Sequence, residues 1–243
     1  MRNRIRGLAD DPLRCTRCRL HTDLCACDVL LPMPVATELI VVAHRYEVRK
    51  PTSTGRLAVM CLAGARLCLR GLHGSPDDPV ASSPGRQSIL LFPSPGAVPL
   101  DEWKAARLES APPVTLFVPD GTWRQAKRVR RRVPGMSDIT AVIVPDACAT
   151  GLRLRQPNRP DRLATLEAIA LALGILEGPA VQDHLLRAFR TVVERSLWSN
   201  GRLSSEQITT SIPAGARQDG PVERSTIAPL SSATGPKARI LHG

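Results

Sequence analysis

The sequence has 243 residues and a formal net charge of +11, with 33 lysines and arginines against 22 aspartates and glutamates. No stretch reaches the roughly 18 uninterrupted apolar residues that a membrane-spanning helix needs. The basic start, residues 1–6, does not lead into the apolar core of a signal peptide. These features argue against a membrane protein or an exported one, and we expect a cytoplasmic protein with no membrane partner.

The balance of apolar residues favours an α/β fold. Hydrophobic residues make up 43% of the chain, but aromatic residues only 3%, so the core must be built from aliphatic side chains. That mixture is typical of buried parallel strands covered by helices. A chain of this length suits one α/β domain of ordinary size with small attachments.

Arginine carries almost all of the positive charge, because the only lysines are Lys50, Lys104, Lys127 and Lys237. A guanidinium binds phosphate oxygens in pairs and stacks on bases, so the excess indicates contact with RNA. A GC-rich coding bias explains the ratio of arginine to lysine equally well. It does not explain the excess of positive over negative charge.

The first elements in the chain are two closely spaced cysteine pairs, Cys15-x-x-Cys18 and Cys25-x-Cys27. Four thiols in so short a stretch match the ligand pattern of a tetrahedral zinc ion, with an iron-sulfur cluster or uncoordinated thiols as alternatives. Disulfides are disfavoured in a reducing compartment. Residues 1–34 have little apolar periodicity, so we predict a small zinc-binding module with four cysteine ligands there. The other cysteines, Cys61, Cys68 and Cys148, lie in apolar surroundings and are expected in the core.

Four short apolar runs each end in turn-forming residues, which predicts buried strands followed by loops. They cover residues 39–43, 89–92, 114–118 and 139–144. The loops that follow begin at His44, Pro93, Pro119 and Pro145. Ligands of open α/β sheets bind at the carboxyl ends of the strands, so these loops together form the expected active site, with plain surface turns as the alternative.

Apolar residues at helical spacing predict four helices, over residues 54–70, 123–133, 161–174 and 181–197. Asp161 is the expected cap of the third helix. Residues 35–203 are therefore expected to form the catalytic α/β domain. From residue 204 the composition turns to Ser, Thr, Gly, Pro and Ala without periodicity, so residues 204–243 are expected to form a disordered tail.

The segment at the junction of the third predicted strand and the basic helix carries the strongest chemical signal. Asp120 lies where a carboxylate can act as a base, Thr122 can cap the helix, and Trp123 offers a flat face for stacking. Six of the nine residues from 124 to 132 are basic. Such a dense run favours contact with RNA phosphates over a solvated surface.

Five segments occur in the order seen in DTW-domain proteins, and the sequence resembles that family from about Cys15 to Leu197. They are the cysteine pattern, residues 44–57, Leu91-Phe92-Pro93, Asp120-x-Thr122-Trp123 and residues 163–168. The resemblance implies a tRNA-uridine aminocarboxypropyltransferase with a SPOUT-like α/β fold. In such an enzyme the strand-end loops bind S-adenosylmethionine, and the substrate is tRNA.

Candidate site residues combine this resemblance with position in the predicted fold. Asp120 is expected to take the proton from uridine N3 or to cap the helix, and Thr122 and Trp123 complete the catalytic segment. The cofactor-binding candidates are Phe92, Pro93, Ser94, Gly96, Asp120, Val144, Pro145 and Glu167. The RNA-binding candidates are His44, Lys50, Thr54, Arg56, Arg124, Lys127, Arg128, Arg153 and Arg155. His44 can equally be structural, and Glu167 can equally pair with an arginine.

Two other functions fit the same sequence. A SPOUT-type RNA methyltransferase would use the same cofactor and differ in the group it transfers, which the mass of the modified nucleoside distinguishes. A zinc-dependent RNA-binding protein without catalysis would need only the cysteines and the basic helix. That second alternative predicts tRNA binding without saturable binding of S-adenosylmethionine.

Overall fold

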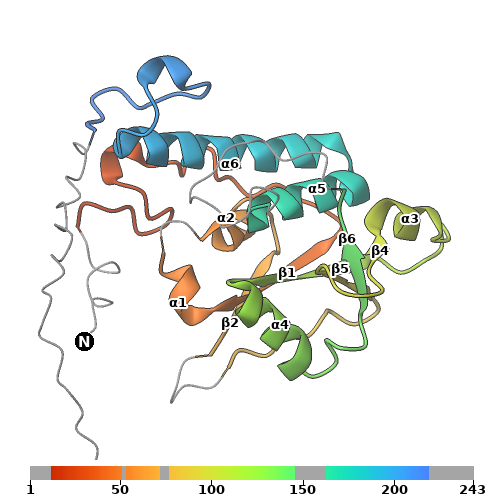
Figure 1. The fold of residues 1–243 in the computed structure, drawn as a ribbon. Coiled ribbons are helices and arrows are strands. Elements are labelled where there is room, and N and C mark those ends of the chain that lie inside the picture. Colours follow the sequence, from red (N-terminus) through yellow and green to blue (C-terminus); the bar gives the residue numbers. More distant parts are fainter. Residues whose placement is uncertain (1–11, 51–52, 72–76, 146–162, 219–243) are drawn as a thin grey trace, which may run out of the picture.

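A six-stranded, all-parallel β-sheet forms the centre of the fold (Figure 1). The structure is a computed structural model, and it describes residues 12–50, 53–71, 77–145 and 163–218. The strands lie in the order β2-β1-β5-β3-β6-β4. Their bounds are Glu38–His44 for β1, Arg66–Arg70 for β2, Gln87–Leu91 for β3, Val98–Pro99 for β4, Val114–Asp120 for β5 and Thr140–Ile143 for β6. The predicted α/β class with a mostly parallel sheet is confirmed.

Helices connect the strands and cover the sheet. Their bounds are Arg45–Val48 for α1, Thr54–Met60 for α2, Leu100–Ala105 for α3, Trp123–Arg132 for α4, Thr165–Glu177 for α5 and Pro179–Ser199 for α6, with short 3-10 turns at Thr22–Leu24 and Ser205–Gln207. Among the described residues, no helix has both the length and the apolar character needed to cross a membrane.

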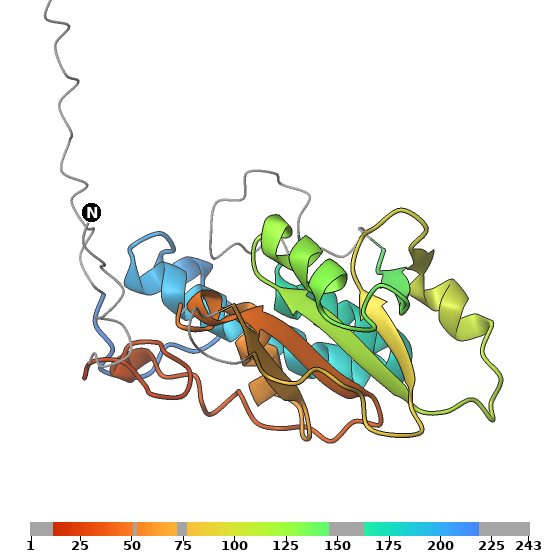
Figure 2. The ribbon, with the colours of Figure 1, turned by 90° about the horizontal axis from the view of Figure 1, so that it is seen from below.

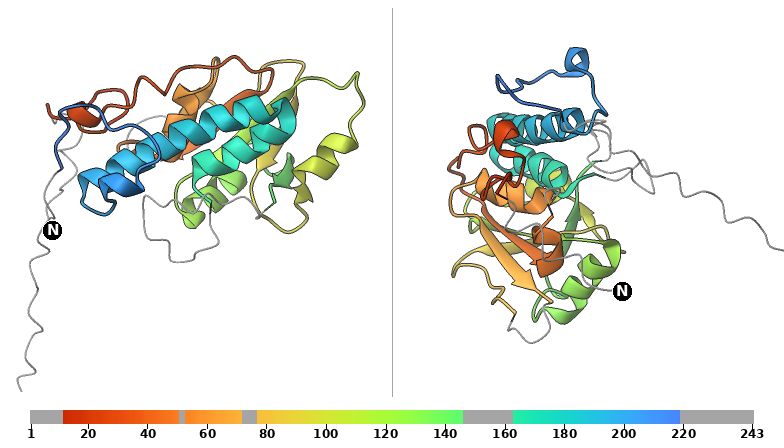
Figure 3. Two further views of the ribbon diagram at one scale, coloured as in Figure 1. Left: turned by 90° about the horizontal axis from the view of Figure 1, so that it is seen from above. Right: turned by 90° about the vertical axis from the view of Figure 1, so that its left-hand side faces the viewer.

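The two faces of the sheet carry different layers, because side chains alternate between the faces along each strand. Leu39 and Val41 of β1 belong to a large apolar cluster with residues of α2, α5 and α6. Ile40 and Val42 belong to a smaller cluster that includes Ala126 of α4. The sheet therefore lies between α2, α5 and α6 on one side and α4 on the other (Figure 2 and Figure 3).

The four predicted strands correspond to β1, β3, β5 and β6. The sequence did not predict β4, which is only two residues long and includes Pro99, a residue with no backbone N–H to donate. It also did not predict that the loop after β1 contains the short helix α1, which His44 caps by accepting a hydrogen bond from the Tyr46 N–H.

The helix predicted over residues 54–70 is wrong in its second half. α2 ends at Met60, Gly64 adopts the left-handed backbone with a φ of 75°, and β2 follows. β2 pairs with β1 in parallel, with Ile40 opposite Arg66. Helical spacing of apolar residues was the misleading signal, because pairing with a neighbouring strand decides β structure more strongly than local sequence does.

The last two helices form an antiparallel pair that is longer than predicted. α5 continues past Gly174 to Glu177, and Gly178 with a φ of 114° separates it from Pro179, the first residue of α6. Gly174 instead allows close packing, since a Cβ there would lie 2.0 Å from the side chain of Gln182. Asp161, the expected cap, lies outside the described residues.

The segment after α6 is held against that helix as far as residue 211. Glu194 accepts hydrogen bonds from the backbone N–H and the hydroxyl groups of Thr209 and Thr210, at 2.6 to 3.0 Å. The buried Arg195 donates to the Ser211 carbonyl at 3.0 Å. These contacts hold residues 209–211, which belong to the stretch expected to form a disordered tail, and residues 219–243 of that stretch lie outside the described residues.

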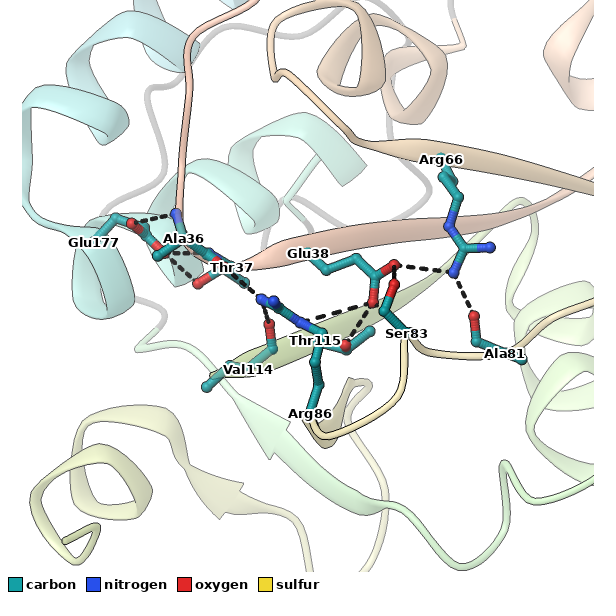
Figure 4. A network of polar contacts seen from close by, with 10 residues as sticks. All are labelled: Ala36, Thr37, Glu38, Arg66, Ala81, Ser83, Arg86, Val114, Thr115 and Glu177. Atoms are coloured by element: carbon teal, nitrogen blue, oxygen red, sulfur yellow. Dashed lines mark hydrogen bonds and ion pairs between the residues drawn. The ribbon is translucent and has the colours of Figure 1, made fainter. Parts of the chain in front are cut away.

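A polar network joins the amino ends of the strands, opposite the predicted active-site loops (Figure 4). The Glu38 carboxylate accepts from the Ser83 N–H at 3.0 Å, the Ser83 hydroxyl at 2.9 Å, the Thr115 hydroxyl at 2.7 Å and Arg66 at 3.1 Å. Glu177 at the end of α5 accepts from the Thr37 N–H at 2.6 Å, just before β1. The network thus holds β1, β5 and α5 together at the amino ends of the strands.

Burial raises the pKa of Glu38, but the hydrogen bonds from Ser83 and Thr115 and the charge of Arg66 outweigh it and lower that pKa to about 2. A pKa below that of the unfolded chain stabilises the fold above pH 4 to 5, and this stabilisation is lost as the pH falls toward the folded pKa.

We therefore predict that Glu38→Gln lowers the free energy of unfolding by about 1–3 kcal/mol at neutral pH. Chemical denaturation at a series of pH values checks this. The difference between wild type and variant should shrink between about pH 5 and pH 3. A difference that stays constant over that range would contradict the proposed role of the ionised carboxylate.

Candidate active site and metal centre

The strand order makes β1 and β5 the switch point of the sheet, so a ligand crevice is expected between their carboxyl ends. These strands are neighbours, with Ala43 opposite Asp120, yet the chain leaves β1 toward α2 on one face and leaves β5 toward α4 on the other. Where adjacent parallel strands send their connections to opposite faces, the carboxyl ends leave a crevice between them, the usual ligand site of open α/β sheets. The structure thus brings the loops after β1 and β5 together as predicted.

Asp120, the last residue of β5, lies at this switch point and is 7% exposed. Its Oδ1 accepts a hydrogen bond from the Thr165 hydroxyl at 2.6 Å, at the first residue of α5. Gly55 of α2 passes so close that a Cβ there would lie 2.6 Å from Oδ2. The carboxylate is therefore held between β5, α2 and α5, and its position depends on both helices.

The next residues of the segment begin α4. The Thr122 hydroxyl accepts from the Gln125 N–H at 3.3 Å, and the Gln125 side chain accepts from the Thr122 N–H at 2.7 Å. This reciprocal capping box gives Thr122 a structural role in starting the helix. Trp123 is 38% exposed, and its ring lies 5.8 Å from that of Phe92 at the end of β3. The indole can therefore offer part of one face to a base.

The exposed side of α4 is strongly basic. Trp123 and four cations line a shallow depression, and these cations are Arg124, Lys127, Arg128 and Arg131. A second depression lies between α4 and the loop after β3, where Phe92, Pro93 and Ser94 meet Lys127, Arg130 and Arg131. Residues predicted to bind the cofactor thus lie next to residues predicted to bind RNA. Sequence reasoning did not single out Arg130 and Arg131, although they belong to the basic run.

Several predicted RNA-binding residues have structural partners. His44 caps α1 and stacks on Tyr46 at 5.4 Å between ring centroids. Lys50 pairs with Glu47 at 2.5 Å, and Thr54 is buried at the start of α2. Arg153 and Arg155 lie outside the described residues.

Arg56 has a structural role that its type alone did not indicate. It donates to the Cys18 carbonyl at 2.9 Å and also to the Arg17 carbonyl, which fastens α2 to the cysteine-rich segment. The guanidinium is thereby directed into the protein rather than toward an RNA ligand.

The cofactor-binding candidates occupy strand ends, with one exception. Phe92 and Ser94 follow β3, and Val144 and Pro145 follow β6. Glu167 is fully buried, and its Oε2 accepts from the Ala164 N–H at 2.9 Å, which caps the start of α5. This contact supports a structural role for Glu167 within the third predicted helix.

The four cysteines near the amino end converge as a metal site requires. The Sγ atoms of Cys15, Cys18, Cys25 and Cys27 all lie within 4.8 Å of one another. The Cys15 and Cys27 sulfurs are 3.6 Å apart, and those of Cys18 and Cys25 are 3.8 Å apart. Ligands about 2.3 Å from a tetrahedral zinc ion are separated by about 3.8 Å, so the cluster fits such an ion. These separations are far too long for disulfide bonds.

The electrostatics of the cluster also favour a cation. Burial raises the pKa of the Cys15 thiol, but hydrogen bonds from the backbone of Cys18 and Arg17 outweigh it and lower the pKa to about 6. Burial raises the pKa of the Cys18 and Cys27 thiols, and charge on neighbouring sulfurs raises it further. Four thiolates cannot ionise together without a cation to offset their repulsion, and a bound divalent ion supplies it.

The cysteine-rich segment packs into the main domain instead of forming a separate unit. Cys18, Leu20, Ala26 and Leu30 belong to the same apolar cluster as the sheet and its helices. Arg195 of α6 donates to the Cys25 carbonyl and lies 3.5 Å from Asp28. Because Arg195 also holds Ser211, one buried side chain joins the four-cysteine centre to the segment after α6. No sequence pattern had indicated this residue.

The chain is an α/β protein with an all-parallel sheet, a basic helix after the strand that carries Asp120, and a four-cysteine cluster able to hold a metal. The model of the DTW domain matches residues 12–197, so the chain belongs to the DTW domain family.

Three relatives share most of its length. A tRNA-uridine aminocarboxypropyltransferase 2 of Drosophila melanogaster is 28% identical, with 82% of each chain covered. A tRNA-uridine aminocarboxypropyltransferase 2 of Macaca fascicularis is 30% identical over 80% of this chain and 67% of its own length. A tRNA-uridine aminocarboxypropyltransferase A of Arabidopsis thaliana is 29% identical over 74% of this chain and 79% of its own. No solved structure matches this chain significantly.

We predict that the purified protein contains about one equivalent of metal and that Cys15→Ser lowers both this content and the melting temperature, because structural metal sites contribute directly to folding. Elemental analysis and thermal unfolding check this. Cys68→Ser is the matched control, since Cys68 is a buried thiol of β2 outside the cluster. Metal content that is equal in the two variants would contradict the assignment.

Proposed function

We propose that this protein is a tRNA-uridine aminocarboxypropyltransferase, which transfers the 3-amino-3-carboxypropyl group of S-adenosylmethionine to N3 of a tRNA uridine. The observation that carries the proposal is the position of Asp120-x-Thr122-Trp123 at the switch point between β1 and β5, where the basic helix α4 begins. The relatives that share most of the chain are named as such enzymes, which supports the proposal. The sulfonium of the donor provides a good leaving group, so the protein must mainly orient the reactants and remove a proton.

In the proposed reaction a bond forms between uridine N3 and the side-chain carbon next to the sulfur, while the carbon–sulfur bond breaks and methylthioadenosine leaves. The N3 proton goes to a base. Asp120 suits this role, because it lies at the switch point and the Thr165 hydroxyl orients its carboxylate. Thr122 supports the site indirectly by fixing the start of α4.

The two substrates would occupy neighbouring sites at the carboxyl ends of the strands. We assign the donor to the SPOUT-like arrangement of strand-end loops, with Phe92, Pro93, Gly96, Val144 and Pro145, which follow β3 and β6, as its expected contacts. We assign the RNA to the depression along α4, with Trp123 as the stacking surface and Arg124, Lys127 and Arg128 as phosphate contacts.

The metal of the four-cysteine centre is proposed to be zinc, in a structural role. All four ligand positions are filled by cysteine, which leaves no open position for a substrate. The buried thiols of Cys61 and Cys68 are consistent with a reducing compartment such as the cytoplasm.

The test is to incubate unmodified tRNA with the purified protein and S-adenosylmethionine and to analyse the nucleosides by mass spectrometry. We expect a uridine heavier by one aminocarboxypropyl group, together with methylthioadenosine. Asp120→Asn should lower turnover by about 100-fold or more, because the amide cannot accept the proton. Asp101→Asn, which changes an exposed carboxylate of α3, is the control. A methylated nucleoside would instead support a methyltransferase, and tRNA binding without any product would support a non-catalytic RNA-binding protein.

A second prediction uses the close approach of α2 to Asp120. In Gly55→Ala the new methyl group would lie 2.6 Å from Oδ2, so either the carboxylate or the helix must move. Displacement of a reacting group by about 1 Å can lower turnover by about 100-fold. We expect turnover to fall by about 10-fold or more, as such displacements cause. Circular dichroism should show that the variant is still folded. Turnover equal to wild type would show that the position of Asp120 does not control the reaction.

A further inference from the structure

The depression between α4 and the loop after β3 has the composition of an oxyanion site. Its floor includes Phe92, and its polar groups come from Ser94, Lys127, Arg130, Arg131 and Ser137. Three of these groups are cations and two are hydroxyls, of which the Ser137 hydroxyl donates to the Asp138 carboxylate at 3.1 Å, and no carboxylate of the described residues lines the depression itself. Guanidinium, ammonium and hydroxyl groups together are the usual donors to phosphate oxygens.

The cations on this side of α4 lie close to one another along the helix. Arg130 and Arg131 follow Lys127 by three and four residues, spacings at which side chains of a helix are neighbours. Within the described part of the chain, none of the six basic side chains of α4 forms an ion pair with a carboxylate. Like charges at this spacing repel, and a bound anion relieves the repulsion.

Ser94 provides a second, uncharged indication. Its Oγ is buried and has no hydrogen-bond partner among the described residues. The position of this residue is set by a tight turn, in which the Ser94 carbonyl accepts from the Ala97 N–H at 3.0 Å, with Pro95 and Gly96 in the middle. Gly96 has a φ of 79°, as a type II turn requires after proline. A buried hydroxyl that lacks a partner is unfavourable, so a ligand oxygen would stabilise this arrangement.

The place of the depression relates it to the proposed reaction. Phe92 contributes to its floor and also contacts the Trp123 ring, at 5.8 Å between centroids. Lys127 and Arg131 line both this depression and the one beside Trp123. An anion here would therefore lie next to the surface assigned to the base of the substrate.

We propose that this depression binds a phosphodiester of the RNA close to the target uridine, with Arg130 and the Ser94 hydroxyl as its specific donors. The proposal rests on the proposed function, because it takes tRNA as the substrate. It assigns Ser94 to the RNA, whereas the sequence had suggested a cofactor contact. The carboxylate of S-adenosylmethionine is the other oxyanion expected at the carboxyl ends of the strands. The experiment distinguishes this carboxylate from a phosphodiester of the RNA.

The experiment measures two affinities without turnover: tRNA by fluorescence anisotropy at several salt concentrations, and S-adenosylmethionine by calorimetry. Arg130→Gln should weaken tRNA binding by about 10-fold and reduce the salt slope by about 1, as expected for one lost phosphate contact. Ser94→Ala removes no charge, so it should weaken tRNA binding by a factor of about 3 to 10 with an unchanged slope. Neither variant should change the affinity for S-adenosylmethionine.

Arg132→Gln is the matched control, because it removes the same charge from the same helix at an exposed position outside both depressions. Equal losses in Arg130→Gln and Arg132→Gln would mean general attraction by the basic surface and would overturn the proposal. Weakened binding of S-adenosylmethionine in Arg130→Gln or Ser94→Ala would also overturn it, in favour of the carboxylate. If the protein transferred no aminocarboxypropyl group but these tRNA effects were observed, the phosphate site would stand and the proposed reaction would fail.

Discussion

Parallel pairing of β1 with β5 is the constraint on which the arrangement of the site depends. It places Ala43 opposite Asp120 and so brings together two loops that are far apart in the chain. The connections after these strands go to opposite faces, so α2 packs on one face of the sheet and α4 on the other. Glu38 secures the same two strands at their amino ends, through Thr115. The stabilising polar network thus lies at the amino ends of the strands, and the proposed active site lies at their carboxyl ends.

Two arginines, the partly buried Arg56 and the buried Arg195, join the four-cysteine centre to the rest of the fold. Arg56 joins it to α2, and Arg195 joins it to α6 and to the segment that follows. α2 also carries Gly55, which lies against Asp120. A change in the four-cysteine centre can therefore reach Asp120 through one short helix. A metal bound by the four cysteines would thus help to fix the helix that limits the position of the carboxylate, without taking part in the proposed chemistry.

The motif residues of this protein fall into two groups. Some stabilise the fold, and others are proposed to contact a ligand. Thr122 and Glu167 cap α4 and α5, and Arg56 braces the cysteine-rich segment. Asp120 combines both kinds of role, because it contacts Thr165 and also lies at the carboxyl end of a strand at the switch point. On α4, the exposed cations have no carboxylate partner in the described part of the chain, and their uncompensated charge makes this helix the natural surface for a polyanion. The loop after β3, which carries Ser94, lines one of the two depressions beside α4.

The sequence by itself determined the features that depend on neighbouring residues. Apolar runs followed by Pro, Gly and Asp predicted β1, β3, β5 and β6, and the spacing of Cys15 to Cys27 predicted a cluster able to hold a metal. Tertiary structure decided the features that depend on partners far along the chain. Residues 66–70 form a strand because they pair with β1. Residues 209–211 lie against α6 because Glu194 and Arg195 bind them. Local patterns record which face of an element is apolar, but not which distant group will satisfy its polar atoms, so the partners of Gly55, Arg56 and Asp120 required the folded chain.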